Sequence, residues 1–286
     1  MPQLARDSRG RAIVNLLNLA EGEFIADCRA VRDFDEPDHF LVMATARGLV
    51  KKTPLAAYRR PLKAGIIAIK LRDGDELVDV VVTGPGDEVL LSTASGMAIR
   101  FKQSDARPMG RNSSGVKGIK LIGDDRVVGM VVAEPGAALL TVCENGYGKR
   151  TPFGPNLETD LGDEQPAAEV VDDDAPEVEN EVEAEAEESE ESHSSQRSYR
   201  TQHRGGKGLR DIKTTERNGP VIGICRVHEE DELLMITARG KIQRIRAAEI
   251  SVVGRNTQGV RIMNLGDSDN LVAVKRVPQE ENGEEE

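Results

Sequence analysis

The chain has 286 residues, of which 38% are hydrophobic and 31% are charged, a composition typical of a soluble protein. No apolar run approaches the roughly 20 residues needed to cross a bilayer, and Arg6, Asp7, Arg9 and Arg11 interrupt any signal-peptide core. The three cysteines are too widely spaced for a metal site or a disulfide framework. We therefore expect a cytoplasmic protein with no membrane partner.

The net charge of −12 is unevenly distributed along the chain. Residues 158–193 hold 17 Asp or Glu and no Lys or Arg, and the tail 278–286 holds five Glu. Setting these 22 of the 50 acids aside leaves 28 acids against all 38 bases, a surplus of 10 positive charges. This basic body is able to attract a polyanion over long range.

One pattern recurs along the chain as an acid, an apolar run, a two-residue polar spacer, a glycine and a short strand that ends in a base. Its copies are Asp38–Thr45 with Gly48 and Lys52, Asp87–Thr93 with Gly96 and Arg100, Leu139–Cys143 with Gly146 and Arg150, and Asp231–Thr237 with Gly240 and Arg244. The glycines lie 48, 50 and 94 residues apart, so the last gap is about two periods. We interpret each copy as a β-hairpin whose glycine supplies the positive φ of a tight turn.

A second pattern alternates with the first: a glycine, a short apolar strand, an acidic turn and another apolar strand. Its copies are Gly10–Val31, Gly65–Val82, Gly115–Val132, Gly208–Val227 and Gly259–Val277. Together the patterns predict four strands every 48 to 50 residues, which is typical of propeller blades. A β-sandwich with coincidental spacing is the alternative, which the repeated glycine and base disfavour.

The order of the patterns predicts the domain organisation. Because the chain opens on a copy of the second pattern, residues 1–32 are expected to complete a blade begun upstream, so that the chain is a fragment. We divide it into blades at 1–157, a disordered acidic insert at 158–198, further blades at 199–277 and an acidic tail at 278–286.

A glycine-rich loop follows the insert, with the sequence Gln202-His203-Arg204-Gly205-Gly206-Lys207-Gly208. Accessible backbone N–H groups beside two bases are able to approach a phosphate closely, although this composition is also ordinary for a loop. It lacks the Walker A pattern, so no nucleotide site or cofactor is implied. The loop resembles the Q-R-R-G-G-K-G box of the DNA gyrase A family, with His203 in place of an arginine. Residues 8–17, 145–151, 216–219 and 249–260 look like the same family.

This resemblance implies an all-β fold, a six-bladed β-pinwheel in which neighbouring blades exchange strands, with about four and a half blades present here. It further implies that duplex DNA bends around a basic outer rim and that this supports ATP-dependent negative supercoiling by the holoenzyme, formed with the rest of gyrase A and with gyrase B. The catalytic tyrosine of the family lies in a separate N-terminal region, so we expect no enzyme in this chain alone. The defining box belongs to the first blade, so the late copy here is expected to have a secondary role.

The base that ends each first-pattern copy is expected to recur at one height and radius, forming a curved band of charge that suits bent duplex held by its phosphates. The candidate DNA-binding residues are the box residues Gln202, Arg204, Gly205, Gly206, Lys207 and Gly208, together with Lys51, Lys52, Arg59, Arg60, Arg100, Lys102, Arg107, Arg111, Lys149, Arg150, Arg244, Arg246 and Arg255. The loops between the two halves of a copy add Lys63 and Lys117 to this band. With 3% aromatic residues and no Trp there is no platform for stacking single-stranded bases, so sequence preference is expected to come through bendability. No catalytic set or metal cluster is apparent.

Two other functions remain open. The C-terminal domain of topoisomerase IV is the nearest, and a propeller scaffold that binds proteins is the second. The insert is either a solubilising loop or an internal polyanion that competes with DNA for the basic rim.

Overall fold

The computed structural model describes residues 19, 22–23, 25–60, 65–156, 197–266 and 268–277, and within these ranges the fold is all-β. The strands are β1 (Phe40–Thr45), β2 (Leu49–Pro54), β3 (Leu77–Thr83), β4 (Glu88–Thr93), β5 (Met97–Lys102), β6 (Val116–Lys117), β7 (Val127–Ala133), β8 (Ala138–Cys143), β9 (Tyr147–Pro152), β10 (Leu209–Arg210), β11 (Val221–Val227), β12 (Glu232–Thr237), β13 (Ile242–Arg246), β14 (Val260–Arg261) and β15 (Leu271–Val277). Short 3-10 turns follow three of the hairpins: η2 (Leu55–Tyr58), η3 (Gln103–Asp105) and η4 (Ala247–Glu249). No helix in the described ranges is long and apolar enough to cross a membrane.

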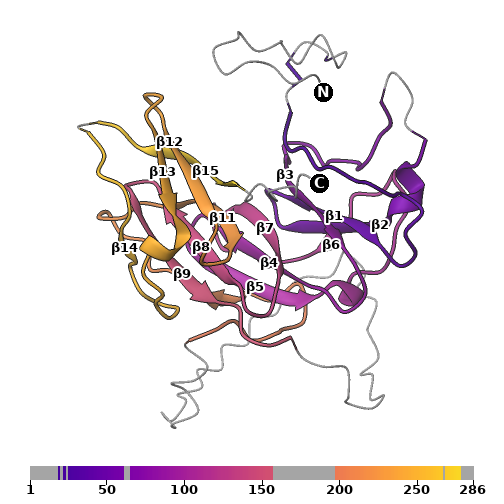
Figure 1. The fold of residues 1–286 in the computed structure, drawn as a ribbon. Coiled ribbons are helices and arrows are strands. Elements are labelled where there is room, and N and C mark those ends of the chain that lie inside the picture. The colour runs from indigo at the N-terminus through magenta and orange to yellow at the C-terminus, as the bar shows by residue number, and fades with distance from the viewer. Residues whose placement is uncertain are drawn as a thin grey trace, which may run out of the picture.

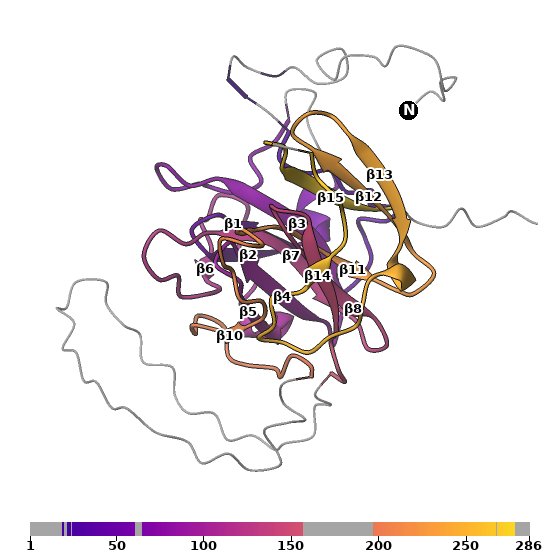
Figure 2. The ribbon, with the colours of Figure 1, turned by 90° about the vertical axis from the view of Figure 1, so that its left-hand side faces the viewer.

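The strands form four antiparallel sheets that follow one another in chain order, from the indigo strands to the yellow ones in Figure 1. The sheet orders are β3-β1-β2-β6, β10-β5-β4-β7, β11-β8-β9-β14 and β13-β12-β15. The two-residue strands β6, β10 and β14 each come from chain that follows the next hairpin, so neighbouring sheets exchange an outer strand. Figure 2 shows β10 beside β5, although the acidic segment separates them in sequence. The predicted propeller with strand exchange is confirmed.

Each sheet is built on one of the predicted hairpins. The turn glycines Gly48, Gly96, Gly146 and Gly240 all have φ between +79° and +84°, which side chains with a Cβ rarely adopt. The four hairpins therefore share one register, in which Val42 faces Lys52 in the first and Leu90 faces Arg100 in the second.

The hydrophobic core lies between consecutive sheets. Alternate residues of a strand point to opposite faces, so Val89 and Leu91 pack toward the first sheet while Leu90 packs toward the third. All six residues of β4 are buried, which follows from a sheet covered on both faces.

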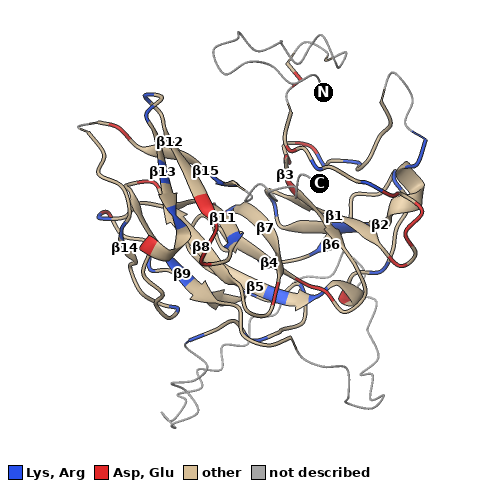
Figure 3. Cartoon of the chain, viewed as in Figure 1, with Lys and Arg blue, Asp and Glu red and all other residues tan. Residues whose placement is uncertain are grey.

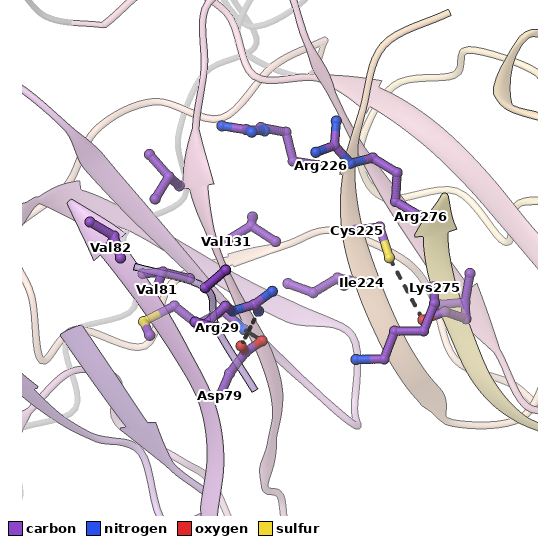
Figure 4. Close-up of a pocket in the computed structure, with 14 residues that line it drawn as sticks. Arg29, Asp79, Val81, Val82, Val131, Ile224, Cys225, Arg226, Lys275 and Arg276 are labelled. Carbon is purple, nitrogen blue, oxygen red and sulfur yellow. Dashed lines mark hydrogen bonds and ion pairs between the residues drawn. The ribbon is translucent and has the colours of Figure 1, made fainter. Parts of the chain in front are cut away.

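The inner strands β3, β7, β11 and β15 pack side by side and, with Arg29 and Ala30, line a cavity of about 420 Å³. Figure 4 shows Arg29 paired with Asp79 on one side of this cavity and Lys275 on another strand. The nitrogen and oxygen atoms of the Arg29–Asp79 pair lie 2.8 Å apart. Burial raises the pKa of Asp79, and the backbone N–H of Met130 and the Arg29 guanidinium oppose that rise. Two further arginines of the cavity, Arg226 and Arg276, pair with Glu134 and Asp231, respectively.

Two predicted strands are wrong. Residues 66–71 form no strand, and neither do the described residues of the early half-blade, 25–32. In the other copies the segment that corresponds to 66–71 pairs with the second strand of the preceding hairpin, as β6 does with β2. No described strand lies in that position for 66–71, so its backbone has no ladder to join, and Ile67 is 65% exposed. The insert and the tail lie outside the described residues except Arg197 and Ser198.

A second set of glycines positions the exchanged strands. Gly115, Gly208 and Gly259 each stand one residue before the short strand, with φ between +73° and +99°. A Cβ on Gly208 would lie 2.5 Å from the carbonyl oxygen of Ala98, closer than any real contact. The backbone of the exchanged strand therefore approaches its neighbour at a distance that only glycine allows.

Replacing Gly208 with Ala is expected to lower the free energy of unfolding by about 1–3 kcal/mol, because the new Cβ meets both an unfavourable φ and a backbone oxygen. Gly206→Ala is the matched control in the same loop, since a Cβ there has no neighbour closer than 3.7 Å. Urea unfolding measures the stability of both variants, and equal stabilities would contradict this account of the exchanged strand.

Candidate nucleic-acid interface

The recurring base of the hairpins is buried in three of its four copies. Lys52, Arg100 and Arg150 are 4%, 1% and 5% exposed. The expectation of a surface band formed by these side chains is therefore wrong. Phosphates outside the protein cannot reach groups that the fold has already enclosed.

These buried bases join one sheet to the next. Arg100 donates to Glu88 of its own hairpin at 2.5 Å and to the carbonyl oxygens of Phe153 and Tyr199, which follow the next hairpin. Lys52 donates to the carbonyl oxygen of Gln103 in η3.

Arg150 completes this set, because it donates to the carbonyl oxygens of Ala248 in η4 and of Ile250 just after it. Each base thus binds backbone oxygens at the corresponding place in the following sheet. We call these hydrogen bonds between a buried base and the following sheet the joint. The base recurs because the joint recurs between consecutive sheets.

The lysines Lys51 and Lys149 precede two of these bases and are also buried, so their expected place on the surface is wrong too. Lys51 donates to the carbonyl oxygens of Ala68 and Arg111, and burial lowers its pKa to about 8. Lys149 lies 2.9 Å from the carboxylate of Asp211, and burial lowers its pKa although that carboxylate opposes the change. Lys51 thus fastens the loop before β6, and Lys149, which also donates to the carbonyl oxygen of Gly254, fastens the loop before β14.

The remaining candidates stay on the surface to different degrees. Arg244 is the exception in its column, with a side chain 60% exposed and paired with Glu232. Arg59 pairs with Asp35 at 2.6 Å. Arg60, Arg107 and Arg246 are exposed, and Lys102, Arg111 and Arg255 are half-buried.

The box forms a compact loop on the outer side of β5, in the position that residues 109–115 and 253–259 take before β6 and β14. Arg204 donates to the carbonyl oxygens of Asp105 and Lys117, and the Gly205 N–H donates to the carbonyl oxygen of Gly118. Thus part of the hydrogen-bonding capacity of the box is used inside the protein. Lys207 is exposed and has no bonded partner among the described residues.

Gln202 and Gly206 tie the two edges of the box to the sheets beside it. The Gln202 N–H donates to the carbonyl oxygen of Arg100, and the Gly206 oxygen accepts from the N–H of Lys120. The loop is therefore fixed to two sheets at once, which holds the exposed Lys207 in place.

Half-buried and exposed bases do recur in three of the four sheets, but at positions other than the predicted column. The first position lies four residues before the glycine that precedes each exchanged strand, and it holds Arg111, Arg204 and Arg255. The second position lies two residues after that glycine, and it holds Lys117, Arg210 and Arg261. The second set lies on the outermost strands and is exposed in all three sheets. We name these six residues the outer-edge bases. Figure 3 shows basic positions on the loops around β14.

Arg210 and Arg261 were missed among the candidate residues. The signal that could have found them is their constant offset from Gly208 and Gly259, which equals the offset of Lys117 from Gly115. Lys120 and Lys213, three residues further on, are exposed as well, and the third copy has Asn264 there.

The buried joint has a stability consequence. Arg100→Met is expected to lower the free energy of unfolding by about 3–5 kcal/mol, because it leaves the carboxylate of Glu88 buried without its ion pair. The double variant Arg100→Met/Glu88→Gln should lose less, and Arg210→Met, at an exposed position, should stay within about 0.5 kcal/mol of the parent. Denaturant unfolding measures all three, and an Arg100 variant as stable as the Arg210 variant would refute the joint.

Comparison with known proteins places this architecture in a family. The model of the DNA gyrase C-terminal domain, a β-propeller, matches residues 39–83, 87–134, 196–224 and 231–278. The DNA gyrase A protein of Salmonella typhimurium is 41% identical over 285 residues, and that of Staphylococcus aureus (strain MRSA252) is 37% identical over 288. Both alignments cover 100% of this chain, which spans only 27% and 28% of those proteins.

Solved structures agree with this assignment. A structure of the DNA gyrase A C-terminal domain matches with a TM-score of 0.70 and 27% identity, over 95% of this chain and 75% of that one. The C-terminal domain of DNA topoisomerase IV matches with a TM-score of 0.74 at 19% identity, over 97% of this chain and 73% of that one, a likeness of fold. The matched repeats, the exchanged strands and the curated relatives together show that the chain belongs to the DNA gyrase C-terminal domain family.

Proposed function

We propose that this chain binds duplex DNA along the outer edge formed by β6, β10, β14 and the loops before them, and bends the duplex around that edge. The observation that carries the proposal is the recurrence of the outer-edge bases at the same two positions in three consecutive sheets. Equivalent positions in successive blades follow a curve, so their charges meet successive phosphates of a bent duplex.

The outer edge suits DNA better than the central cavity does. Three of the four cavity bases, Arg29, Arg226 and Arg276, are already paired with carboxylates, which neutralise them. The cavity of about 420 Å³ also has the size of a small-molecule site rather than of a duplex. Phosphates are therefore attracted more strongly to the outer edge.

The box contributes one exposed cation to this surface. Lys207 is exposed at the end of a loop held in place by Arg204, whose guanidinium bonds to two backbone oxygens. Because these two bonds use part of the Arg204 guanidinium, we assign the phosphate contact of the box mainly to Lys207.

The curated relatives are components of DNA gyrase, and the chain spans about a quarter of their length. We infer that it acts with the rest of a gyrase A protein and with gyrase B, and that its DNA bend supports ATP-dependent negative supercoiling in the cytoplasm. In this proposal the chain alone contributes binding and bending, while strand cleavage belongs to the rest of gyrase A.

Removing the exposed bases is expected to change the salt dependence of binding. The parent chain should bind linear duplex with little sequence preference and lose affinity steeply as salt rises. Lys117→Ala/Arg210→Ala/Arg261→Ala removes three phosphate contacts, so the log–log salt slope should fall by roughly 2 to 3, since each contact adds about 0.9.

Fluorescence anisotropy at several salt concentrations measures these slopes. The matched control Arg72→Ala/Arg126→Ala/Lys275→Ala removes three exposed charges that are not among the outer-edge bases and should leave the slope nearly unchanged. The proposal would be contradicted by a salt slope near zero in the parent, or by equal changes of the salt slope in the two triple variants.

The acidic segment 158–193 should weaken DNA binding by competing with phosphates. Its 17 negative charges are covalently attached next to the box, at an effective concentration on the order of millimolar. Replacing the segment by a short Gly/Ser bridge, or neutralising its acids to Gln and Asn at constant length, should tighten binding most at low salt. Tightening by deletion alone would indicate a steric block, and no change in either variant would refute the competition.

A further inference from the structure

The phenol of Tyr147 is shared by two arginines from different parts of the chain. Nε of Arg217 lies 3.1 Å and a terminal guanidinium nitrogen of Arg261 lies 2.9 Å from the Tyr147 oxygen. Both guanidiniums also stand over the ring, 5.1 Å and 5.4 Å from its centroid. Two cations are thus held close together on the outer side of β9.

Within the described part of the chain, no carboxylate lies within ion-pair distance of either arginine. Both side chains are exposed, while Tyr147 is 4% exposed and forms the floor beneath them. Two guanidiniums bound to the same phenol repel each other, and a neutral phenol only partly offsets that repulsion. The geometry therefore favours an anion between the two guanidiniums.

The loop that carries Arg217 is rigidly supported. Asn218 is fully buried, donates to the carbonyl oxygens of Lys213 and Gln258, and accepts from both the N–H and the hydroxyl of Thr215. Asn145, in the β8–β9 turn, donates to the carbonyl oxygen of Arg217 itself. The backbone of the arginine is thus preorganised from two directions, which reduces the entropy lost on binding.

The pair occurs in one sheet of the described fold. The position of Tyr147 is held by Leu49 and Met97 in the first two sheets, and the position four residues before the inner strand, which Arg217 holds here, is Gly123 before β7 and Asp73 before β3. Arg261 belongs to the recurring outer-edge bases, whereas its partners are specific to this blade.

We propose that Arg217 and Arg261 form a two-arginine clamp for a backbone phosphate of duplex DNA, oriented by the hydroxyl of Tyr147. Nε of Arg217 and one terminal nitrogen of Arg261 bond to the phenol, so the other N–H groups of both guanidiniums are left to bind phosphate oxygens. The clamp rests on the proposed function and makes this blade the strongest single point of attachment along the outer edge.

The experiment compares duplex binding by the parent, Arg217→Ala/Arg261→Ala, Arg217→Lys/Arg261→Lys and Tyr147→Phe, each checked by thermal melting. The alanine pair is expected to weaken binding about tenfold or more and to lower the salt slope by roughly 1 to 2. The lysine pair keeps the charge but loses the planar fork, so it should retain the slope and lose part of the affinity. Tyr147→Phe should lose less than the alanine pair. Lys275→Ala is the single-charge control and should bind as the parent does.

A second measurement separates this inference from the proposed function. Hydrogen bonds from Arg217, followed by those from Arg261, lower the pKa of Tyr147, whereas burial raises the pKa values of Tyr58 and Tyr199, so Tyr147 ionises first. Phenolate absorbance monitors the titration of Tyr147. Inorganic phosphate in the clamp should raise the pKa of Tyr147 in the parent and should not change it in the alanine pair.

The outcomes are distinguishable. If the parent binds DNA with a steep salt slope and the alanine pair matches it in affinity and slope, the clamp is overturned while the proposed function stands. If the parent shows no salt-dependent DNA binding, the proposed function fails and the clamp for DNA fails with it. A phosphate-dependent shift in the phenol titration would then assign the pair to free phosphate instead.

Discussion

The hydrogen bonds of the buried base to backbone oxygens of the following sheet are the contacts on which the rest of this structure depends. Burying a guanidinium costs several kcal/mol, and only a full set of acceptors offsets that cost. Arg100 has such a set, with Glu88 on its own hairpin and carbonyl oxygens of Phe153, Tyr199 and Pro155 beyond the next. Removing the base leaves these acceptors unpaired, so the joint specifies how two sheets meet as well as holding them together.

The joint and the exchanged strand act together on the outer edge. Gly208 lets β10 approach β5 closely, and Arg100 binds the chain on either side of the acidic segment at the carbonyl oxygens of Phe153 and Tyr199. Tyr199 in turn donates to Asp211 at 2.6 Å, just beyond β10. The box and the strand after it are therefore anchored at both ends by fully buried groups. Exposed bases on such a support stand at equivalent places on successive sheets, an arrangement that suits the bent duplex of the proposed function.

The sequence predicts the hairpins, their turn glycines and the blade period well, because local turn chemistry and alternating apolar residues determine them. It fails where the outcome depends on a distant segment. Residues 66–71 have the apolar pattern of a strand but no described neighbour to pair with. Lys52 and Arg150 are charged and recur periodically, which favours a surface position, yet a repeated joint gives the same period as a repeated surface. Only the three-dimensional structure separates these explanations, and it transfers the candidate site to Lys117, Arg210 and Arg261.

The most direct test of the account is cross-linking from defined positions to duplex DNA. Single Lys117→Cys, Arg210→Cys, Arg261→Cys and Lys275→Cys variants, in a background where the exposed Cys28 is replaced by Ser, are labelled with a photoactivatable group and irradiated with bound duplex. The account predicts cross-links from the three outer-edge positions and only background from Lys275→Cys in the central cavity. Cross-links from the cavity position, or none from the outer edge by a chain that binds DNA, would contradict it.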